Sequence, residues 1–247
     1  MSAPTARYGL ARVLSKRGLC SRTEAGRLIA AGRVRVDGRI VRDPESPTVL
    51  AAAIVVDDVR AVPATPVHLM LNKPRGLVTT RSDEQGRATV YDCFVGAELP
   101  WIAPVGRLDR ASEGLLLFSN DPAFAAAITE PEHGIEKTYH VQVEGQVDHD
   151  VLARLEAGVA VEGELWRAAR ATVLRRGAKN CWLEIVLDEG RNRQIRRMLD
   201  ALGFPVLRLI RVAIAGLTLG DLAKAQWRVL TDADIAALQL PGFLRSA

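Results

Sequence analysis

The stretch Gly106–Asp121, which reads G-R-L-D-R-A-S-E-G-L-L-L-F-S-N-D, places a charged loop directly before an apolar run. Asp109 lies between Arg107 and Arg110 in the loop, whereas Gly114–Phe118 carries no charge and has the length of a short buried strand. An acid between two arginines has two interpretations. It is either a structural loop in which the carboxylate pairs with a neighbouring guanidinium, or a reactive carboxylate held at the edge of the core.

Outward from this stretch, strand-like runs outnumber helical runs. Alternation and β-branched composition predict strands at Val67–Leu71, Leu77–Thr80, Ile102–Val105, Thr138–Val143, Trp182–Leu187 and Val206–Ile214. Apolar residues at helical spacing predict helices over residues 121–129, 148–156, 192–202 and 231–238, the first with Pro122 just inside its start. Because the strands occur in adjacent runs, a mixed α+β fold with a mainly antiparallel sheet is favoured.

Two further polar clusters interrupt these runs. The first, Glu136–Val141, puts Tyr139 on a predicted strand, where a half-buried structural tyrosine is the simpler interpretation. The second, Asp188–Leu199, opens a predicted helix with four arginines in seven residues, namely Arg191, Arg193, Arg196 and Arg197. A solvated basic face would explain them, but arginines are unfavourable near the positive end of a helix dipole, which indicates an anionic ligand.

The first sixty residues follow a different order of helix, helix and hairpin. Residues 8–17 and 22–31 have helical spacing, each run is followed by a glycine, and Ser21 with Glu24 forms a capping box before the second. Asp37–Gly38 predicts a tight hairpin, and Ile54–Val56 adds a strand. The basic side chains expected at outward positions are Arg12, Lys16, Arg17, Arg22, Arg27, Arg33 and Arg35. They form either a solubilising surface or a nucleic-acid contact.

The net charge of +4 is concentrated in this N-terminal quarter. Of 247 residues, 48% are hydrophobic and 25% are charged, as in a globular protein. Residues 1–62 carry eleven basic and six acidic side chains, or +5, whereas the remaining 185 residues carry 22 and 23, or −1. Such asymmetry is typical of a nucleic-acid-binding part on a near-neutral body. The connector Ala61–Pro66, which holds two prolines, predicts one domain over residues 1–62 and a second over residues 63–247.

Several other classes of function lack their motifs. No glycine-rich phosphate loop, H-E-x-x-H or G-x-S-x-G is present, and the four histidines and three cysteines show no metal-ligand spacing. No uncharged stretch exceeds twelve residues, and the N-terminus has no apolar signal core. The sequence therefore predicts a cytoplasmic protein without a membrane span, and it argues against dehydrogenase, NTPase, metallohydrolase and serine-hydrolase chemistry.

The motifs resemble those of a known family. The stretch quoted first, K-T-Y-H-V-Q-V from Lys137 and E-G-R-N-R-Q-I-R-R-M-L from Glu189 are similar, in order and spacing, to motifs of the ribosomal-RNA pseudouridine synthases of the RsuA/RluB/RluE/RluF type. The run Leu10–Arg39 resembles the RNA-binding domain named after ribosomal protein S-four, which that type also carries. The likeness covers about Tyr8–Leu238, with minor departures such as Ser119 and Pro122.

This resemblance implies the isomerisation of uridine to pseudouridine in ribosomal RNA without a cofactor or metal, and the G-R-N-R-Q string leans toward the large subunit. By resemblance, Asp109 is the catalytic aspartate, Arg196 is the basic residue paired with it, and Tyr139 stacks beneath a flipped base. The aspartate acts either as nucleophile or as base toward the ribose. The body would then be the catalytic domain.

A monomer that binds ribosomal RNA or a pre-ribosomal particle is expected. Its RNA contacts would come from the outward N-terminal side chains and from Arg107, Arg110, Arg191 and Arg193. The alternative is a non-catalytic RNA-binding or ribosome-assembly factor on the same scaffold.

Overall fold

A computed structural model describes residues 6–240, which form two compact units. The first comprises the described residues up to His68 together with Ala97–Ala103 and Phe118–Ala125. The second comprises Leu69–Gly96, Pro104–Leu117 and the described residues from Ala126 onward. The domain boundary between residues 62 and 63 stays a prediction.

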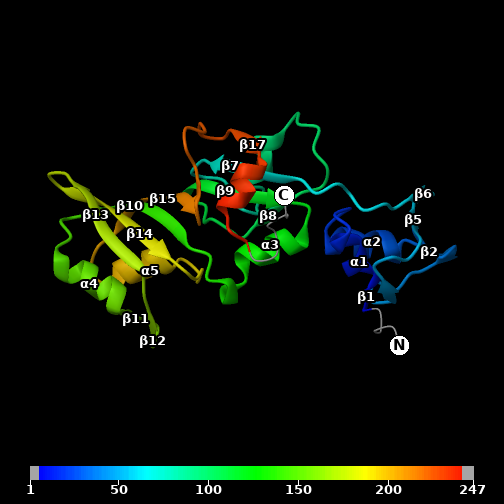
Figure 1. The fold of residues 1–247 in the computed structure, drawn as a ribbon, viewed down its shortest axis with the longest axis horizontal. Helices are drawn as coiled ribbons and strands as arrows, with labels where there is room; N and C mark the ends of the chain where they lie inside the picture. The colour runs from blue at the N-terminus through cyan, green and yellow to red at the C-terminus, as the bar shows by residue number, and fades with distance from the viewer. Residues whose placement is uncertain (1–5, 241–247) are drawn as a thin grey trace. The chain divides into compact units, whose positions relative to one another are not determined.

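The N-terminal part of the first unit contains two helices and short strands (Figure 1). Helix α1 spans Leu10–Lys16 and helix α2 spans Arg22–Ala30. Strands β2 (Val34–Val36), β3 (Arg39–Ile40), β5 (Ile54–Val56) and β6 (Val59–Arg60) form an antiparallel sheet in the order β3-β2-β5-β6. Strands β1 (Arg7–Gly9) and β4 (Pro47–Val49) form a second, separate pair. The helices and the sheet share one buried apolar core, to which α1 contributes Leu10, Val13 and Leu14.

Local signals in the sequence account for this part of the chain. The hydroxyl oxygen of Ser21 accepts a hydrogen bond from the Glu24 amide at 3.0 Å and so caps α2. Asp37 and Gly38 both have positive φ, 49° and 80°, which is the backbone of a tight hairpin turn whose twist matches the flanking strands. The two predicted helices, the hairpin and the strand at Ile54–Val56 are confirmed, within a residue or two at their ends.

The prediction that Arg17 faces outward is wrong, because its side chain is buried. Its guanidinium donates hydrogen bonds to the carbonyl oxygens of Leu50, Ala52 and Ala61, at 2.7, 2.5 and 2.8 Å. Buried carbonyls need donors, and one guanidinium carries five N–H groups in a fixed fork. Burial, with a smaller contribution from Arg60, lowers the pKa of Arg17. Arg17 therefore holds the loop around Leu50 to the helix pair instead of facing a partner.

The second unit is built on a mixed sheet in the strand order β13-β14-β10-β15-β9-β7-β17 (Figure 1). The neighbours β13, β14, β10 and β15 pair antiparallel, while β15 and β9 pair in parallel. The strands are β7 (His68–Lys73), β8 (Ala103–Val105), β9 (Glu113–Ser119), β10 (Lys137–Glu144), β13 (Arg170–Arg176), β14 (Asn180–Leu187), β15 (Val206–Ile214), β16 (Leu217–Thr218) and β17 (Trp227–Val229). This arrangement confirms the α+β class and the mainly antiparallel sheet.

Helices and one hairpin cover the face of the sheet that carries Val141, Leu183 and Leu209. These are α4 (His149–Ala157), α5 (Gln194–Ala201) and the pair β11 (Val159–Val161) and β12 (Glu164–Trp166), whose apolar side chains share one core with the sheet. Two further helices are α3 (Pro122–Thr129) and α6 (Asp232–Ala237), and two short 3-10 helices are η1 (Val90–Phe94) and η2 (Pro131–His133). Within residues 6–240, no helix is long and apolar enough to cross a membrane.

The parallel contact between β9 and β15 depends on a glycine. Gly114 lies opposite Arg211 with φ +100°, and a Cβ atom built on it would lie 2.2 Å from the Arg211 carbonyl oxygen. Any other residue would force the strands apart. Next to it, the buried carboxylate of Glu113 accepts hydrogen bonds from Arg208 at 3.1 Å and from Lys224 at 2.6 Å. This seam therefore joins β9 to β15 by close backbone approach and by an ion-pair network.

The strand predicted at Leu77–Thr80 is wrong. The segment is irregular and makes only an isolated bridge between Val78 and Thr89. Its Thr79 hydroxyl donates a 2.7 Å hydrogen bond to the Leu108 carbonyl. The segment thus supports the loop around Asp109 instead of extending the sheet.

Candidate active site

A cavity of about 730 Å³ in the second unit gathers residues from five parts of the chain. They come from the turn after β8, from the end of α3 and the start of η2, from β10, from the segment between β14 and α5 with the ends of both, and from β15. Asp109 and Tyr139 both line it. Its charged lining residues are Arg107, Asp109, Lys137, Glu189, Arg191, Arg193 and Arg211. Five cations against two acids give this cavity a net positive charge, as a site for an anionic ligand requires.

Backbone contacts hold the turn that carries Asp109. The Ser112 amide donates to the Asp109 carbonyl at 3.0 Å, and the Gly76 amide donates to the Arg110 carbonyl at 2.8 Å. Thr79 Oγ1 donates to the Leu108 carbonyl. The turn is therefore fastened on both sides of Asp109, while the carboxylate itself keeps 26% of its side-chain surface exposed.

Lys73 lies buried near this turn, and the sequence motifs did not single it out. Its Nζ donates to the carbonyl oxygens of Ser112 and Pro74, at 2.9 and 3.1 Å. Burial lowers the pKa of Lys73 to about 8, and the nearby carboxylate of Asp109 acts in the opposite direction. The available signal in the sequence was the Asn72-Lys73-Pro74 turn that follows the apolar run Leu69–Leu71.

Arg193 forms an ion pair with Asp109. Its Nη1 lies 3.9 Å from Asp109 Oδ2, and Arg193 adopts a left-handed backbone, φ 54°, at the N-cap of α5. A non-glycine residue in this conformation carries strain of about 1 kcal/mol or more, which is commonly found at functional sites. The structural-loop interpretation pairs Asp109 with Arg107 or Arg110. In residues 6–240 neither arginine forms an ion pair with Asp109, and both are exposed.

Arg196 does not form the ion pair with Asp109 that the resemblance implied, as far as residues 6–240 show. Its Nη1 and Nη2 donate to the carbonyl oxygens of Val206 and Ala111, at 3.2 and 3.1 Å. Burial, followed by Arg193, lowers the pKa of Arg196, while Asp109 raises it. The charge of Asp109 therefore reaches Arg196. Through its hydrogen bond to the Ala111 carbonyl, Arg196 also fixes the backbone two residues after Asp109.

The loop before α5 is held by a network that the sequence did not reveal. Gln194 is buried, accepts from the Arg191 amide at 3.2 Å and donates to Glu189 Oε1 at 2.6 Å. Two guanidinium groups pack on the ring of Trp166 of β12, that of Arg191 at 5.3 Å from the ring centroid and that of Arg197 at 5.6 Å. Carboxylates of the same hairpin bind the same arginines, namely Glu164 with Arg191 and Glu162 with Arg197. Hairpin β11–β12 thus orders the basic loop.

Tyr139 is half-buried on β10 and faces the cavity from the sheet. The strand register places it opposite Arg211 on β15 and opposite Ile185 on β14. Asp109 and Tyr139 therefore meet in one cavity, with Arg193 beside the carboxylate. Among residues 6–240, no group of three or more histidine, cysteine, aspartate or glutamate side chains is arranged to hold a metal ion.

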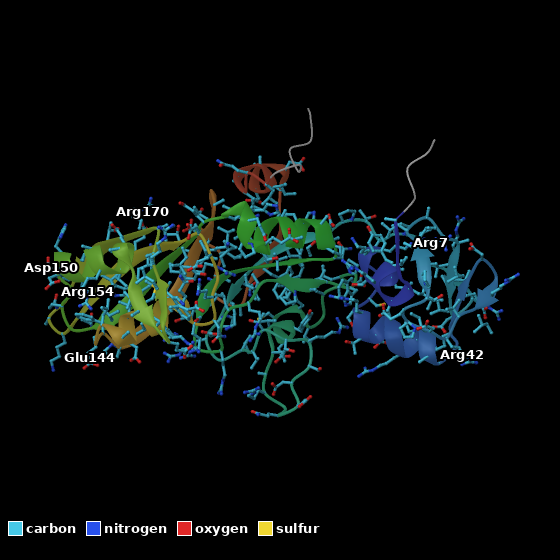
Figure 2. The ribbon with its side chains drawn as sticks, turned by 90° about the horizontal axis from the view of Figure 1, so that it is seen from below. Arg7, Arg42, Glu144, Asp150, Arg154 and Arg170 are labelled. Carbon is cyan, nitrogen blue, oxygen red and sulfur yellow. The ribbon has the colours of Figure 1, made fainter. Side chains whose placement is uncertain are left out.

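The predicted basic residues of the first unit, other than Arg17, are exposed or half-exposed. Arg12 and Lys16 lie over the ring of Tyr8, at 5.4 and 4.8 Å from its centroid. Three others are partly neutralised by acids, in the pairs Arg27 with Glu24, Arg33 with Asp57, and Arg35 with Asp58. Further arginines at this surface that sequence reasoning did not single out include Arg7 and Arg42 (Figure 2). The first unit therefore presents a basic surface, of which α1 supplies the least neutralised part.

Comparisons with known proteins identify the family of the chain. The family model for RNA pseudouridylate synthase matches residues 67–201, and that for the S4 domain matches residues 9–47. The chain is 35% identical to ribosomal large subunit pseudouridine synthase B of Bacillus subtilis over 93% of its own length and 95% of the relative. It is 36% identical to an uncharacterized RNA pseudouridine synthase of Aquifex aeolicus, over 92% of each chain.

A solved structure points the same way. The crystal structure of a pseudouridylate synthase superposes with a TM-score of 0.67 and 28% identity, covering 94% of this chain and 99% of that one. The matched family region contains the Asp109 turn, Tyr139 and the loop before α5. The chain therefore belongs to the RNA pseudouridylate synthase family and carries an N-terminal S4 domain.

Proposed function

We propose that the protein isomerises a specific uridine of ribosomal RNA to pseudouridine, with the large subunit favoured, and that Asp109 is the reacting carboxylate. The observation that carries the proposal is the placement of Asp109 and Tyr139 in one cationic cavity. The ribosomal substrate is supported by the Bacillus subtilis relative, whose name specifies the large ribosomal subunit.

The reaction needs a carboxylate that stays ionised. One nitrogen–carbon glycosidic bond breaks, the uracil turns, and its carbon 5 bonds to the same ribose carbon. The carbon 5 proton leaves to a base, and nitrogen 1 ends protonated. Arg193 forms an ion pair with Asp109 at 3.9 Å, and this contact suits either role of the carboxylate, attack on the ribose or removal of a proton from it. Tyr139 supplies an aromatic face for the uracil and a hydroxyl for proton transfer.

The target base must leave its helix to enter the cavity. Unstacking a nucleotide costs about a few kcal/mol, which contacts made with the flipped form have to offset. A volume of about 730 Å³ lies in the range of pockets that enclose a small molecule. Arg107 lines this cavity on its exposed side, so it is placed for a phosphate contact beside the flipped nucleotide.

The basic surface of the first unit would bind structured RNA by backbone charge and shape. Arg12, Lys16 and Arg22 are its principal candidates, because they lie at the surface and no acid pairs with them among the described residues. In this proposal the protein acts as a monomer and without a cofactor, since Asp109, Tyr139 and the arginines suffice for the chemistry.

The test is to map pseudouridine in ribosomal RNA from cells that lack the protein, then to restore the wild type, Asp109→Ala or Asp150→Ala. Asp150 lies at the surface on α4 (Figure 2) and serves as the matched control. We expect one uridine to lose its modification, and wild type and Asp150→Ala to restore it. Restoration by Asp109→Ala would refute the assignment of the carboxylate. If no pseudouridine is lost, the protein is a non-catalytic binding or assembly factor.

A further inference from the structure

Arg211 is a buried cation that the proposed chemistry does not use. It is 5% exposed, and the only hydrogen bond of its side chain among the described residues runs from Nε to the Leu115 carbonyl, at 2.7 Å. Its Nη2 is buried with no protein acceptor in the same part of the chain. A buried guanidinium with unsatisfied donors is costly, so such a group usually has a ligand or an acidic partner. No acid forms an ion pair with Arg211 within residues 6–240.

A second cation lies beside Arg211. Lys137, at the start of β10, is half-buried, and burial followed by the charge of Arg211 lowers its pKa. Asp188 offsets this only in part. Both cations line the cavity that Asp109 and Tyr139 line, and the strand register places Tyr139 directly opposite Arg211. Two like charges thus adjoin in the wall of the cavity, and no carboxylate of residues 6–240 is bound to either.

A third donor, without a partner in the part of the chain that the structure describes, lines the same cavity. The hydroxyl of Ser112 is buried, lines the cavity and has no hydrogen-bond partner among the described residues. Ser112 belongs to the Asp109 turn, since its amide donates to the Asp109 carbonyl. The other charged groups of the cavity are accounted for: Arg193 pairs with Asp109, and Arg191 pairs with Glu189. The uncompensated positive charge is therefore concentrated at Lys137 and Arg211, with Arg107 at the exposed side.

We propose that Arg211 and Lys137, with the Ser112 hydroxyl, form a binding site for a phosphate group of the nucleotide that enters the cavity. A phosphate matches these groups in charge and in its number of acceptor oxygens, whereas a uracil carbonyl would leave two cations uncompensated. The proposal rests on the proposed function, because it takes the cavity to be the nucleotide site. In this role Arg211 and Lys137 bind and position the substrate, and the reacting groups remain those of the proposed function, Asp109 and Tyr139.

Uridine and uridine 5′-monophosphate serve as probes, since they differ only in the phosphate. Binding of each to the full chain would be measured by isothermal titration calorimetry for wild type, Lys137→Met, Arg211→Lys and Arg170→Met. Arg170 projects from β13 (Figure 2) and does not line the cavity, so it is a control for the removal of one positive charge. Lys137 is only half-buried, so its replacement remains informative even if changes at Arg211 disturb folding.

We expect wild type and Arg170→Met to prefer the monophosphate by about tenfold, which is the effect of one good charge-assisted contact. Lys137→Met should reduce this preference to about twofold, and Arg211→Lys should reduce it less, because a lysine keeps the charge but not the fork. An unchanged preference in both variants would overturn the proposal. So would equal affinity of wild type for both probes, or an equal loss of uridine and monophosphate binding, which would assign the cations to the nucleoside.

This readout is independent of catalysis. Suppose that no ribosomal pseudouridine depends on the protein, but that wild type prefers the monophosphate and Lys137→Met loses this preference. The cavity is then a nucleotide site, and only the isomerase proposal fails. If the modification depends on Asp109 but the preference is absent, the phosphate site fails alone.

Discussion

Among single residues, Lys73 makes the stability of the protein depend on pH. Its pKa is about 8 in the folded chain, against an ordinary value of 10.5. A folded-state pKa below the unfolded value means that unfolding takes up a proton between these values, so this group makes the fold more stable as pH rises from about 8 to 10.5. Below pH 8 the burial of the charged lysine carries its full cost.

We therefore expect the free energy of unfolding of wild type, relative to that of Lys73→Met, to increase by about 2 kcal/mol between pH 7.5 and pH 9.5. Urea denaturation of both proteins at the two pH values measures this difference, and other alkaline titrations cancel because both proteins share them. Parallel behaviour of wild type and variant would show that Lys73 titrates at its ordinary pKa.

Arg17 provides a second test at this scale, because it is basic but buried. Arg17→Met leaves the carbonyls of Leu50, Ala52 and Ala61 without their donor, which should cost about 3 kcal/mol of stability. Hydrogen exchange of amides in α1 and β5 of the full chain would report the destabilisation. Arg12→Met, which removes an exposed charge from the same helix, should leave exchange unchanged. A similar increase in exchange in both variants would contradict the structural role of Arg17.

At the scale of elements, hairpin β11–β12 holds arginines at and just before the start of α5, and we predict that it competes there with RNA phosphates. Glu164 binds Arg191 and Glu162 binds Arg197, so these guanidinium groups are partly neutralised in the free protein. In the double variant Glu162→Gln with Glu164→Gln, Arg197 loses its acidic partner and Arg191 keeps only Glu189 among the described residues, so both guanidinium groups are more available to phosphates. RNA binding should then tighten, and the slope of log affinity against log salt should steepen by about 1 to 2.

Binding of a ribosomal RNA fragment measured at several salt concentrations checks this. The control is Glu84→Gln with Glu98→Gln, which removes the same charge from acids outside the cavity lining. If the control steepens the slope equally, net charge alone explains the effect and the hairpin has no particular part in it.

Elements with strong local signals could be predicted from the sequence, and those defined by long-range pairing could not. The capped helix α2, the Asp37–Gly38 hairpin and the long alternating strands carry their own information. Strand β13, by contrast, is mostly exposed and rich in arginine, so its hydrophobic pattern is weak, and it is a strand because β14 pairs with it. Leu77–Thr80 has strand-like composition but makes only an isolated bridge.

For the site, the sequence motifs identified Asp109 and Tyr139, which the structure brings into one cavity. The partner of Asp109 was not predictable, because Arg193 reaches it only through a left-handed backbone at the start of α5. Lys73, Gln194, Trp166 and Arg211 were missed for a related reason. Their positions depend on burial and on contacts between distant segments, and a single sequence carries neither.

At the scale of the whole molecule, the excess of positive charge lies in residues 1–62, whereas the proposed active site lies in the second unit. Replacing Arg12, Lys16 and Arg22 by glutamine in the full chain should weaken RNA binding and reduce the salt slope by about 2 to 3, one for each phosphate that is no longer neutralised. Removing three charges from the surface of the second unit, Arg154→Gln with Arg170→Gln and Lys179→Gln, is the matched control and should change the slope less. Equal effects would mean that RNA senses only net charge.

The parallel seam between β9 and β15 also sets an order of events during synthesis. The hydrogen bond from Arg211 to Leu115 joins residues 96 positions apart, and Gly114 allows close approach to a strand that does not yet exist when the Asp109 turn leaves the ribosome. At about 5 to 20 residues per second, several seconds separate the two segments. The N-terminal helices α1 and α2 are therefore synthesised well before β15, the strand that completes the cavity lined by Asp109 and Tyr139.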